Sequence, residues 1–487
     1  ERFKKRRSKS NKTPAFAVLP FKLLQFNTGD DSEDQFLSIG LTDALITRLS
    51  KIKRVVVRPT SAVVRFADDS DPFQAGKELE ADFVLAGNIR RAGNRVRVSA
   101  QLLKIADKST TWAETFDEKF TDVLELEDSI SERVAKSLLP QLTGEEQKQL
   151  HKRETELPEA YEAYLKGRFY WSLMTEEGFA KAIHFYERAV ALDPNYALAY
   201  AAIAEYYIFL AIHCVIPFAE ASRRTKEAAQ KAVAIDPHLS EAQAALGLAA
   251  LNHDFDWNKA EECLLRAIEI NPNSIPAHSW YHTLLLESGR FDEMTVELDR
   301  VLELNPEGLL SLHYLAWAHF HTRRFDESIK IHRRMLKNEP NYAWGHFTFS
   351  WLLRCVGEFT EAVAKAKKGV ELAANNPMYL TALAAAFAEN GQRAEALETL
   401  DAINRMAPTL YISPYMLAII YCSLGEREQA FESLEKALDE CDVWVVWLYV
   451  DPQFDPLRDD ARFDDLLRRM KHPLAPREKV IETKKTD

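Results

Sequence analysis

The chain has 487 residues, enough for two or more domains, and 47% of them are hydrophobic, with only 16 glycines and 20 prolines. This composition excludes a disordered or low-complexity chain. The net charge of −12 argues against nucleic-acid binding by the body of the chain, and no run of 18 apolar residues exists that could span a membrane.

The first 13 residues form a basic linker with seven Lys or Arg and one Glu, so the remaining 474 residues carry a net charge of −18. The sequence starts at Glu1 rather than Met, and we expect a fragment or a processed product. Three interpretations of the basic segment stay open: a solvated linker, the flank of a membrane helix upstream of Glu1, or a nucleic-acid arm. The cellular location, and the side of any membrane, stay undecided at this point.

Residues 14–142 predict a small α/β or α+β domain. Two apolar runs suit buried strands, three amphipathic segments suit helices, and one strand–turn–strand unit turns at Arg91 to Asn94. We expect these elements, in chain order, at 15–21, 36–52, 54–59, 72–81, 82–105 and 123–142. An acidic cluster at 29–35 lacks the ligand spacing of a calcium loop and is interpreted as a solvated loop. A polar linker, 143–159, follows the domain.

Residues 160–442 form repeats with a period of 34 residues, which is lengthened by nine residues between Pro194 and Pro237 and by one between Pro237 and Pro272. A turn residue returns at this step as Gly289, Arg323, Gly357, Gly391 and Gly425, and apolar residues on both sides of it have helical spacing. Small residues also recur, which close helix packing requires. They are Ala316, Ser350, Ala384 and Ala418 in the first helix of a unit, and Ser328, Ala362, Ala396 and Ala430 in the second.

This helix–turn–helix unit resembles the tetratricopeptide repeat. About eight units are present, followed by a capping segment (443–472) and a polar tail (473–487). The Trp expected at the fourth position of the first helix is missing: the chain has His278, Leu312, His346 and Leu380 there. The predicted fold class is therefore a small α/β domain followed by an all-α tetratricopeptide-repeat superhelix.

The amino-terminal part carries AVLPF, then GLTDALITRLSKIKRVVVRPTSAV, then FVLAGNIRRAGNRVRVSAQLLKI. These stretches resemble the bacterial TolB-like amino-terminal domain, which is commonly joined to tetratricopeptide repeats. Such tandems occur in CadC-type transcriptional regulators and in cyclase- or kinase-linked signalling proteins. The resemblance spans nearly all of residues 15–470 and implies a regulatory or sensory portion. The resemblance does not identify the output module, that is, the DNA-binding, cyclase or kinase domain to which such a tandem is joined.

The sequence shows no zinc-protease, serine-hydrolase, phosphate-loop or dinucleotide-binding motif, and we predict no enzyme and no cofactor. Histidines crowd the middle repeats, but no carboxylate or cysteine is placed to complete a metal site with them. We interpret them as helix-face and groove residues: His282, His313, His319, His321 and His332. The five scattered cysteines are expected to be buried, reduced thiols.

The resemblance also implies that the first helix of each unit lines a concave groove. The residues expected there in the fifth and sixth units are His313, Trp317, Phe320, Trp344, Phe347, Trp351 and Arg354. The Lys and Asn of carboxylate-clamping arrays are absent. These rings instead suit a protein or peptide partner with an apolar or aromatic segment. The alternative is that the rings pack between units or against the returning superhelix.

Two functions remain open on the sequence. One is a non-catalytic interaction and regulatory or sensory module of a bacterial signalling or transcription-control protein. The other is a free-standing envelope or complex-assembly scaffold. The partner, the signal and the oligomeric state do not follow from the sequence.

Overall fold

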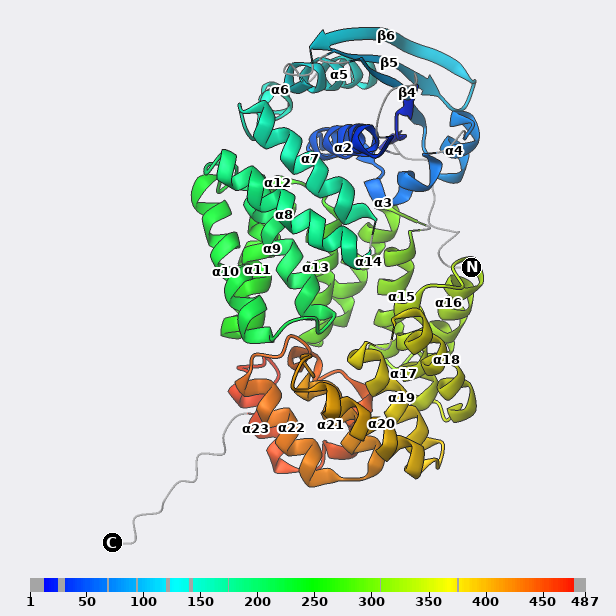
Figure 1. The fold of residues 1–487 in the computed structure, drawn as a ribbon, viewed down its shortest axis with the longest axis vertical. Coiled ribbons are helices and arrows are strands. Elements are labelled where there is room, and N and C mark those ends of the chain that lie inside the picture. Colours follow the sequence, from blue (N-terminus) through cyan, green and yellow to red (C-terminus); the bar gives the residue numbers. More distant parts are fainter. Residues whose placement is uncertain are drawn as a thin grey trace, which may run out of the picture.

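The computed structural model shows a small sheet domain followed by a long run of helices (Figure 1). The predicted fold class is confirmed. The described residues are 13–24, 31–67, 70–92, 95–119, 123–139, 143–173, 175–306, 308–374 and 376–476. Outside them lie nearly all of the basic linker, the first residues of the acidic cluster, Gly93 and Asn94 of the predicted turn, and the tail from residue 477 onward.

The sheet has the strand order β3-β1-β4-β5-β6, and β2 also pairs with β4. Pairing is parallel where β1 meets β3 and β4, and antiparallel from β4 through β5 to β6. The strands are β1 (Ala15–Val18), β2 (Lys22–Leu23), β3 (Val56–Val57), β4 (Phe83–Ala92), β5 (Arg95–Lys104) and β6 (Ser109–Lys119). The sequence analysis did not predict β6. This edge strand has only two large apolar residues, Trp112 and Phe116, so its alternation is weak.

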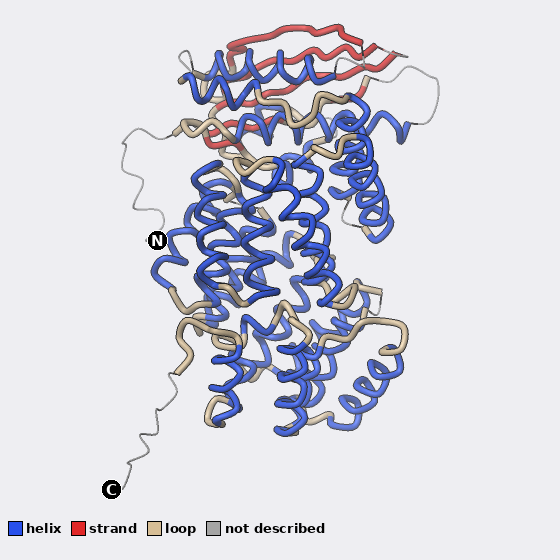
Figure 2. The backbone as a smooth tube through the Cα atoms, turned by 90° about the vertical axis from the view of Figure 1, so that its left-hand side faces the viewer, coloured by secondary structure: helices blue, strands red, loops and turns tan. Residues whose placement is uncertain are grey.

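The helices of this domain pack beneath the sheet (Figure 2). They are α2 (Asp31–Ser50), α3 (Thr60–Val63), α4 (Pro72–Glu78), α5 (Val123–Leu138) and α6 (Gly144–His151), with the short 3-10 turn η1 (Val64–Phe66) after α3. On β5, Val96, Val98 and Leu102 are buried while Arg95 and Arg97 are exposed, so the predicted one-sided alternation is confirmed. Helix α6 lies within the stretch that the sequence analysis treated as a polar linker, and Thr143 with Glu146 forms a capping box at its start.

Sixteen helices in the described residues, α7 to α22, form eight successive helix–turn–helix pairs. They are α7 (Pro158–Ser172), α8 (Glu176–Leu192), α9 (Ala197–Ile212), α10 (Phe218–Ile235), α11 (Ser240–Asp254), α12 (Trp257–Ile270), α13 (Ile275–Glu287), α14 (Phe291–Leu304), α15 (Leu309–His321), α16 (Phe325–Asn338), α17 (Ala343–Cys355), α18 (Phe359–Leu372), α19 (Pro377–Glu389), α20 (Arg393–Met406), α21 (Pro414–Leu424) and α22 (Arg427–Asp439). The 3-10 turns η3 (Val445–Trp447) and η4 (Pro452–Leu457) and helix α23 (Ala461–Arg469) complete the described chain.

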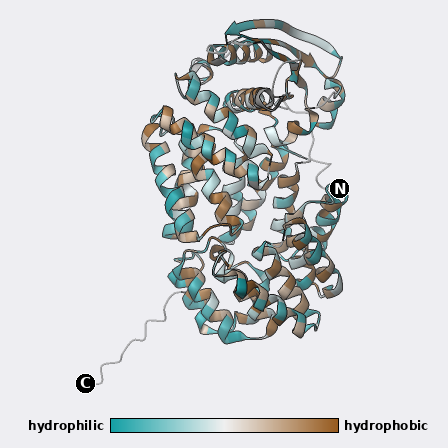
Figure 3. Ribbon diagram, viewed as in Figure 1, coloured by the Kyte–Doolittle hydropathy of each residue, from teal (hydrophilic) through white to brown (hydrophobic). Residues whose placement is uncertain are grey.

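The recurring small residues lie at the contacts between paired helices. All eight of them are fully buried, as their spacing predicts. In the fifth pair, the Ser328 hydroxyl donates to the carbonyl of Ala316 at 2.7 Å, which requires the two helices to approach closely. Most repeat helices accordingly carry both apolar and polar stretches (Figure 3).

The sheet domain and the first repeats share one hydrophobic core. Leu41 and Leu45 of α2 belong to the same buried cluster as Tyr161 and Leu165 of α7. A Cβ at Gly40 would lie 3.0 Å from the Leu165 side chain, so the two helices meet closely here. The sheet domain therefore packs directly against the superhelix through apolar contacts, in addition to the covalent connection between them.

Polar contacts set the orientation of the sheet domain on later repeats. The side-chain amide of Asn273 donates to carbonyl oxygens at the end of α2, 2.9 Å from Ser50 and 3.1 Å from Ile52. Arg58 donates to the carbonyl of Leu304, in the fourth helix pair, at 2.8 Å. Carbonyls at helix ends lack partners within their helix. Asn273 of the repeats supplies the donor at the end of α2, and Arg58 of the sheet domain supplies the donor at the end of α14.

Candidate functional site

The structure brings the seven predicted groove residues together. We call them the aromatic cluster: His313, Trp317 and Phe320 on α15, and Trp344, Phe347, Trp351 and Arg354 on α17. The ring centroids of Trp317 and Trp351 are 5.9 Å apart, and those of Phe347 and Trp351 are 4.7 Å apart. The Trp344 indole donates to Nε2 of His313 at 2.9 Å. Positions three and four residues apart share a helix face, so the cluster follows from the spacing.

The carboxy-terminal strap, residues 441–458, covers the aromatic cluster. The Trp444 ring lies 5.9 Å from the rings of both Trp344 and Trp351, and the Trp447 ring lies 5.6 Å from that of Trp317. Trp351 is 1% exposed, whereas Trp344 is only half-buried. In this structure the rings thus contact the chain's own carboxy-terminal residues. This is the alternative given in the sequence analysis, in which the rings pack against the returning superhelix.

The strap and the residues that follow α23 tie the early repeats to the late ones. The Trp444 indole donates to the carbonyl of Ile212, the last residue of α9, at 3.1 Å. Nε2 of His472 lies 3.0 Å from the carbonyl of Glu287, the last residue of α13. The Trp257 indole of α12 donates to the carbonyl of Met470 at 3.0 Å. The carboxy-terminal residues therefore connect helices that are far apart along the superhelix.

Arg354 fixes the strap at the other end of the cluster. Its guanidinium donates to Glu389 of α19 at 2.7 Å, to the side-chain oxygen of Gln453 at 2.8 Å and to Ser423 at 2.7 Å. Arg354 is 5% exposed. Burial opposes its charge, but the Glu389 carboxylate outweighs this and raises the pKa of Arg354. The ion pair therefore stays charged inside the molecule and holds Gln453 in place.

Four of the five histidines of the middle repeats are buried and His319 is half-buried, and all five are neutral. Burial lowers the pKa of His282, His319 and His332 to about 4, and that of His313 and His321 to about 3. Across the described ranges, His, Cys, Asp and Glu side chains form no group of three or more that could hold a metal ion. Within those same ranges, no helix combines the length and apolar character needed to cross a bilayer.

Sequence reasoning missed the residues of the strap that complete this site, above all Trp444, Trp447 and Gln453. A signal was present: the last repeat is followed by DVWVVWLYV, an apolar run with two tryptophans three residues apart. Such a run in a terminal segment must find a buried surface. Which surface it finds depends on the curvature of the superhelix, which the sequence pattern does not specify.

Asp442 anchors the start of the strap. Its carboxylate accepts hydrogen bonds from the Ser413 hydroxyl at 2.6 Å, from the Tyr415 amide at 3.2 Å and from the Trp444 amide at 2.9 Å. The side chain is fully buried. Burial raises the pKa of Asp442 to about 7, although these three hydrogen bonds favour the charged form.

We expect Asp442 to make the stability of the chain depend on pH. A carboxyl group whose pKa is higher in the folded state binds its proton more tightly there, so the free energy of unfolding falls as pH rises from about 4 to about 7. The Asp442→Asn substitution removes this term. As the pH rises from 5 to 8, the free energy of unfolding of the variant should increase relative to that of the native chain by on the order of 2–3 kcal/mol. Urea titrations followed by tryptophan fluorescence at several pH values measure the difference.

Asp401→Asn is the matched control, because Asp401 is exposed on α20. Its difference from the native chain should not change over the same pH range. If Asp442→Asn behaves as Asp401→Asn does, the buried carboxyl is not the source of the pH dependence.

Comparisons with known proteins support a regulator-like architecture. Residues 11–133 match the family described as HilA/YgeH-like transcriptional regulator, second domain. The transcriptional regulator HilA of Salmonella typhimurium is 21% identical over 455 residues, which cover 92% of this chain and 78% of HilA. The putative adenylate cyclase 3 of Rhizobium meliloti is 29% identical over 192 residues, 39% of this chain. The match spans only 32% of that cyclase.

Solved structures of repeat proteins are also similar. A thermophilic TPR protein of Thermus thermophilus matches 40% of this chain and 98% of its own, with 18% identity and a TM-score of 0.34. YrrB, a TPR protein with an unusual peptide-binding site, matches 39% of this chain and 90% of its own, with 19% identity and a TM-score of 0.26. The repeats themselves are identified by the 34-residue period and the eight helix pairs of this chain, and the chain resembles transcriptional regulators.

Proposed function

We propose that this chain is the non-catalytic interaction and regulatory module of a bacterial signalling or transcription-control protein. The helical repeats suit protein binding, and the HilA-like match over most of the chain supports a regulatory role. The TolB-like character of the sheet domain and the sensory role of the tandem are parts of this proposal. The match to the putative adenylate cyclase covers only 32% of that protein, so it does not support a catalytic function for this chain.

The partner surface in this proposal is the aromatic cluster. The observation that supports it is the strap itself: within the chain, residues 441–458 place two tryptophans against the cluster and the side chain of Gln453 against Arg354. A partner would present an apolar or aromatic segment of the same kind and take the place of the strap. Burial of aromatic anchors in such a groove supplies most of the binding energy in peptide recognition.

The strap has an advantage over any partner in solution, because it is part of the same chain. A tethered segment acts at an effective concentration on the order of millimolar. A partner at micromolar concentration must therefore bind the aromatic cluster about a thousandfold more tightly than the strap does. Otherwise it can bind only when the contacts of the strap with the cluster have been weakened. We expect binding to be controlled by whatever loosens the strap.

A peptide with the sequence of residues 442–458, labelled at its amino terminus, tests the proposal on the full-length chain. The native chain should capture little of it. The Trp444→Ala/Trp447→Ala chain should capture it at least tenfold better, because its own strap no longer fills the surface. Trp317 and Trp351 stay in place, since removing those rings would open cavities in the core. Fluorescence anisotropy measures the binding.

Two controls make the outcome decisive. The same peptide with alanines at its two tryptophans should not bind the double variant. A chain with Trp112→Ala, a substitution in the distant sheet, should capture as little of the original peptide as the native chain does. Hydrogen exchange reports whether the strap is released. A released strap without peptide capture would refute the aromatic cluster as a partner site.

A further inference from the structure

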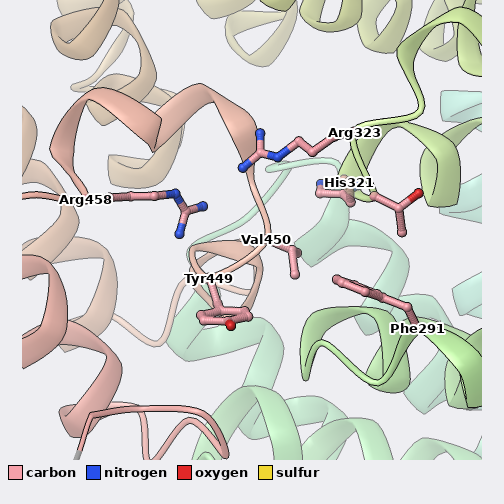
Figure 4. Close-up of a pocket in the computed structure, with 7 residues that line it drawn as sticks. Phe291, His321, Arg323, Tyr449, Val450 and Arg458 are labelled. Carbon is pink, nitrogen blue, oxygen red and sulfur yellow. The ribbon is translucent and has the colours of Figure 1, made fainter.

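A cavity lies where the strap passes the turn between α15 and α16 (Figure 4). It has a volume of about 330 Å³, within the size range of sites for small organic molecules. Its lining comes from α14, from the α15–α16 turn and from the strap: Phe291, His321, Thr322, Arg323, Tyr449, Val450 and Arg458. We call it the turn cleft. It is distinct from the surface of the aromatic cluster that the strap fills.

Two arginines give the turn cleft a positive wall. The guanidinium groups of Arg323 and Arg458 approach each other from the turn and from the strap (Figure 4). Both pair with one oxygen of Asp455, each at 2.7 Å. Two positive charges thus share one carboxylate, and each guanidinium has five N–H donors. The wall retains a net positive charge and donors suited to a second carboxylate.

The opposite side of the turn cleft is aromatic. Phe291, which is 39% exposed, and Tyr449 lie across from the arginines (Figure 4). Tyr449 is half-buried, and its ring stacks on His472 with centroids 4.6 Å apart. Rings at a concave site are typical of contacts with a planar ligand. The cleft therefore combines an anion-binding wall with an aromatic wall.

His321 adds an unsatisfied acceptor to this lining. Its Nδ1 lies 3.0 Å from the carbonyl of Trp317, which can only accept, so the proton is on Nδ1. Nε2 is then an acceptor, and it has no hydrogen-bond partner among the described residues. The side chain is 3% exposed. A buried polar atom without a partner is costly, and a ligand with an O–H or N–H group would remove that cost.

Arg323 stands at the turn position where four other helix pairs have a glycine. Gly289, Gly357, Gly391 and Gly425 have φ between 75° and 82°, and Arg323 has φ 62°. Cys214, in the corresponding turn of the second pair, also has a left-handed φ, of 54°. A residue with a side chain is therefore tolerated at this position, and in the fifth pair it is an arginine that lines the cleft.

We propose that the turn cleft binds a small aromatic carboxylate. The carboxylate would lie on Arg323 and Arg458, the ring against Phe291 and Tyr449, and a hydroxyl or amino group would donate to His321 Nε2. Such a ligand contacts both the repeat turn and the strap, and its binding holds them together. This inference does not depend on the partner proposed for the aromatic cluster.

4-Hydroxybenzoate is a suitable probe, because it has the carboxylate, the ring and the donor. Isothermal titration of the full-length chain should detect saturable binding. The Arg323→Gly substitution introduces the residue found in four of the other turns, so it should preserve or raise the melting temperature while weakening the binding of 4-hydroxybenzoate at least tenfold. Arg324→Gln is the matched control: it removes the same charge from the next residue, which does not line the cleft, and should leave affinity unchanged.

4-Hydroxybenzamide, which keeps the ring and the hydroxyl but lacks the charge, should bind at least tenfold more weakly than 4-hydroxybenzoate. Arg323→Gln provides a second variant if Arg323→Gly alters the fold. The proposal is overturned by absent binding at millimolar 4-hydroxybenzoate, by equal affinity of the native and Arg323 variants, or by equal affinity for the acid and the amide.

Discussion

Replacing Trp444 with alanine will release the strap and lower the free energy of unfolding by about 3–5 kcal/mol, the usual cost of removing a buried Trp or Phe ring. Trp444 is 4% exposed and contacts the rings of Trp317, Trp344 and Trp351. Its indole also donates to the carbonyl of Ile212. The substitution removes packing between the strap and α15 and α17, and also the hydrogen bond that ties the strap to α9.

Hydrogen exchange with mass spectrometry measures this effect by region. Peptides from residues 441–458 and from the ends of α15 and α17 should lose protection in Trp444→Ala. Peptides from β4 and β5 should keep theirs, because the sheet lies at the other end of the molecule (Figure 2). Trp112→Ala is the matched control, with losses expected only in the sheet domain. Unchanged protection of the strap in Trp444→Ala would show that the ring does not hold it.

Breaking the ion pair between the buried Arg354 and Glu389 should also lower the free energy of unfolding. The Arg354→Met substitution leaves the Glu389 carboxylate, the Gln453 amide and the Ser423 hydroxyl without their shared partner. Removing one member of a fully buried pair costs about 3–5 kcal/mol. Because the Glu389 side chain is 25% exposed and still accepts from Ser423, water compensates part of its charge and the loss should lie below that range. Urea titration followed by tryptophan fluorescence is a sensitive measurement. Five of the nine tryptophans of the chain lie in the aromatic cluster or the strap.

A double substitution separates the loss of the pair from the loss of packing. Arg354→Met combined with Glu389→Gln removes the stranded charge, so the double variant should regain part of the stability that Arg354→Met loses. The expected coupling between the two sites lies in the range of roughly 0.5–3 kcal/mol for residues in one network. Additive effects, or a loss below about 1 kcal/mol for Arg354→Met alone, would mean that solvent reaches the pair.

The aromatic cluster illustrates how much of the site could be predicted from the sequence. Spacing of three and four residues on a helix placed Trp344, Phe347 and Trp351 on one face, and the 34-residue period placed Trp317 on the corresponding helix of the preceding pair. Both relations are local, because a helix and its repeat fix them within a few tens of residues. The occupant of that surface comes from Trp444, which lies 93 residues beyond Trp351 in the sequence. No local period relates the two.

The same distinction applies to the sheet domain. The alternation in β5 predicted which residues face the core, because strand geometry puts neighbours on opposite faces. The docking of α2 on α7, and the capping of its end by Asn273, join residues more than a hundred positions apart. Such contacts depend on the curvature of the superhelix, which sums small rotations over many repeats.

The sequence by itself determined the repeat period, the turns, the small residues between paired helices and the grouping of the aromatic side chains, since each depends on short-range backbone geometry. Only the tertiary structure decided that the strap fills the aromatic surface, that Arg354 pairs with Glu389 and Gln453, and that Arg323 and Arg458 meet at one cleft. These depend on how far the superhelix winds before its end returns to its middle, a sum over all repeats that no single repeat encodes.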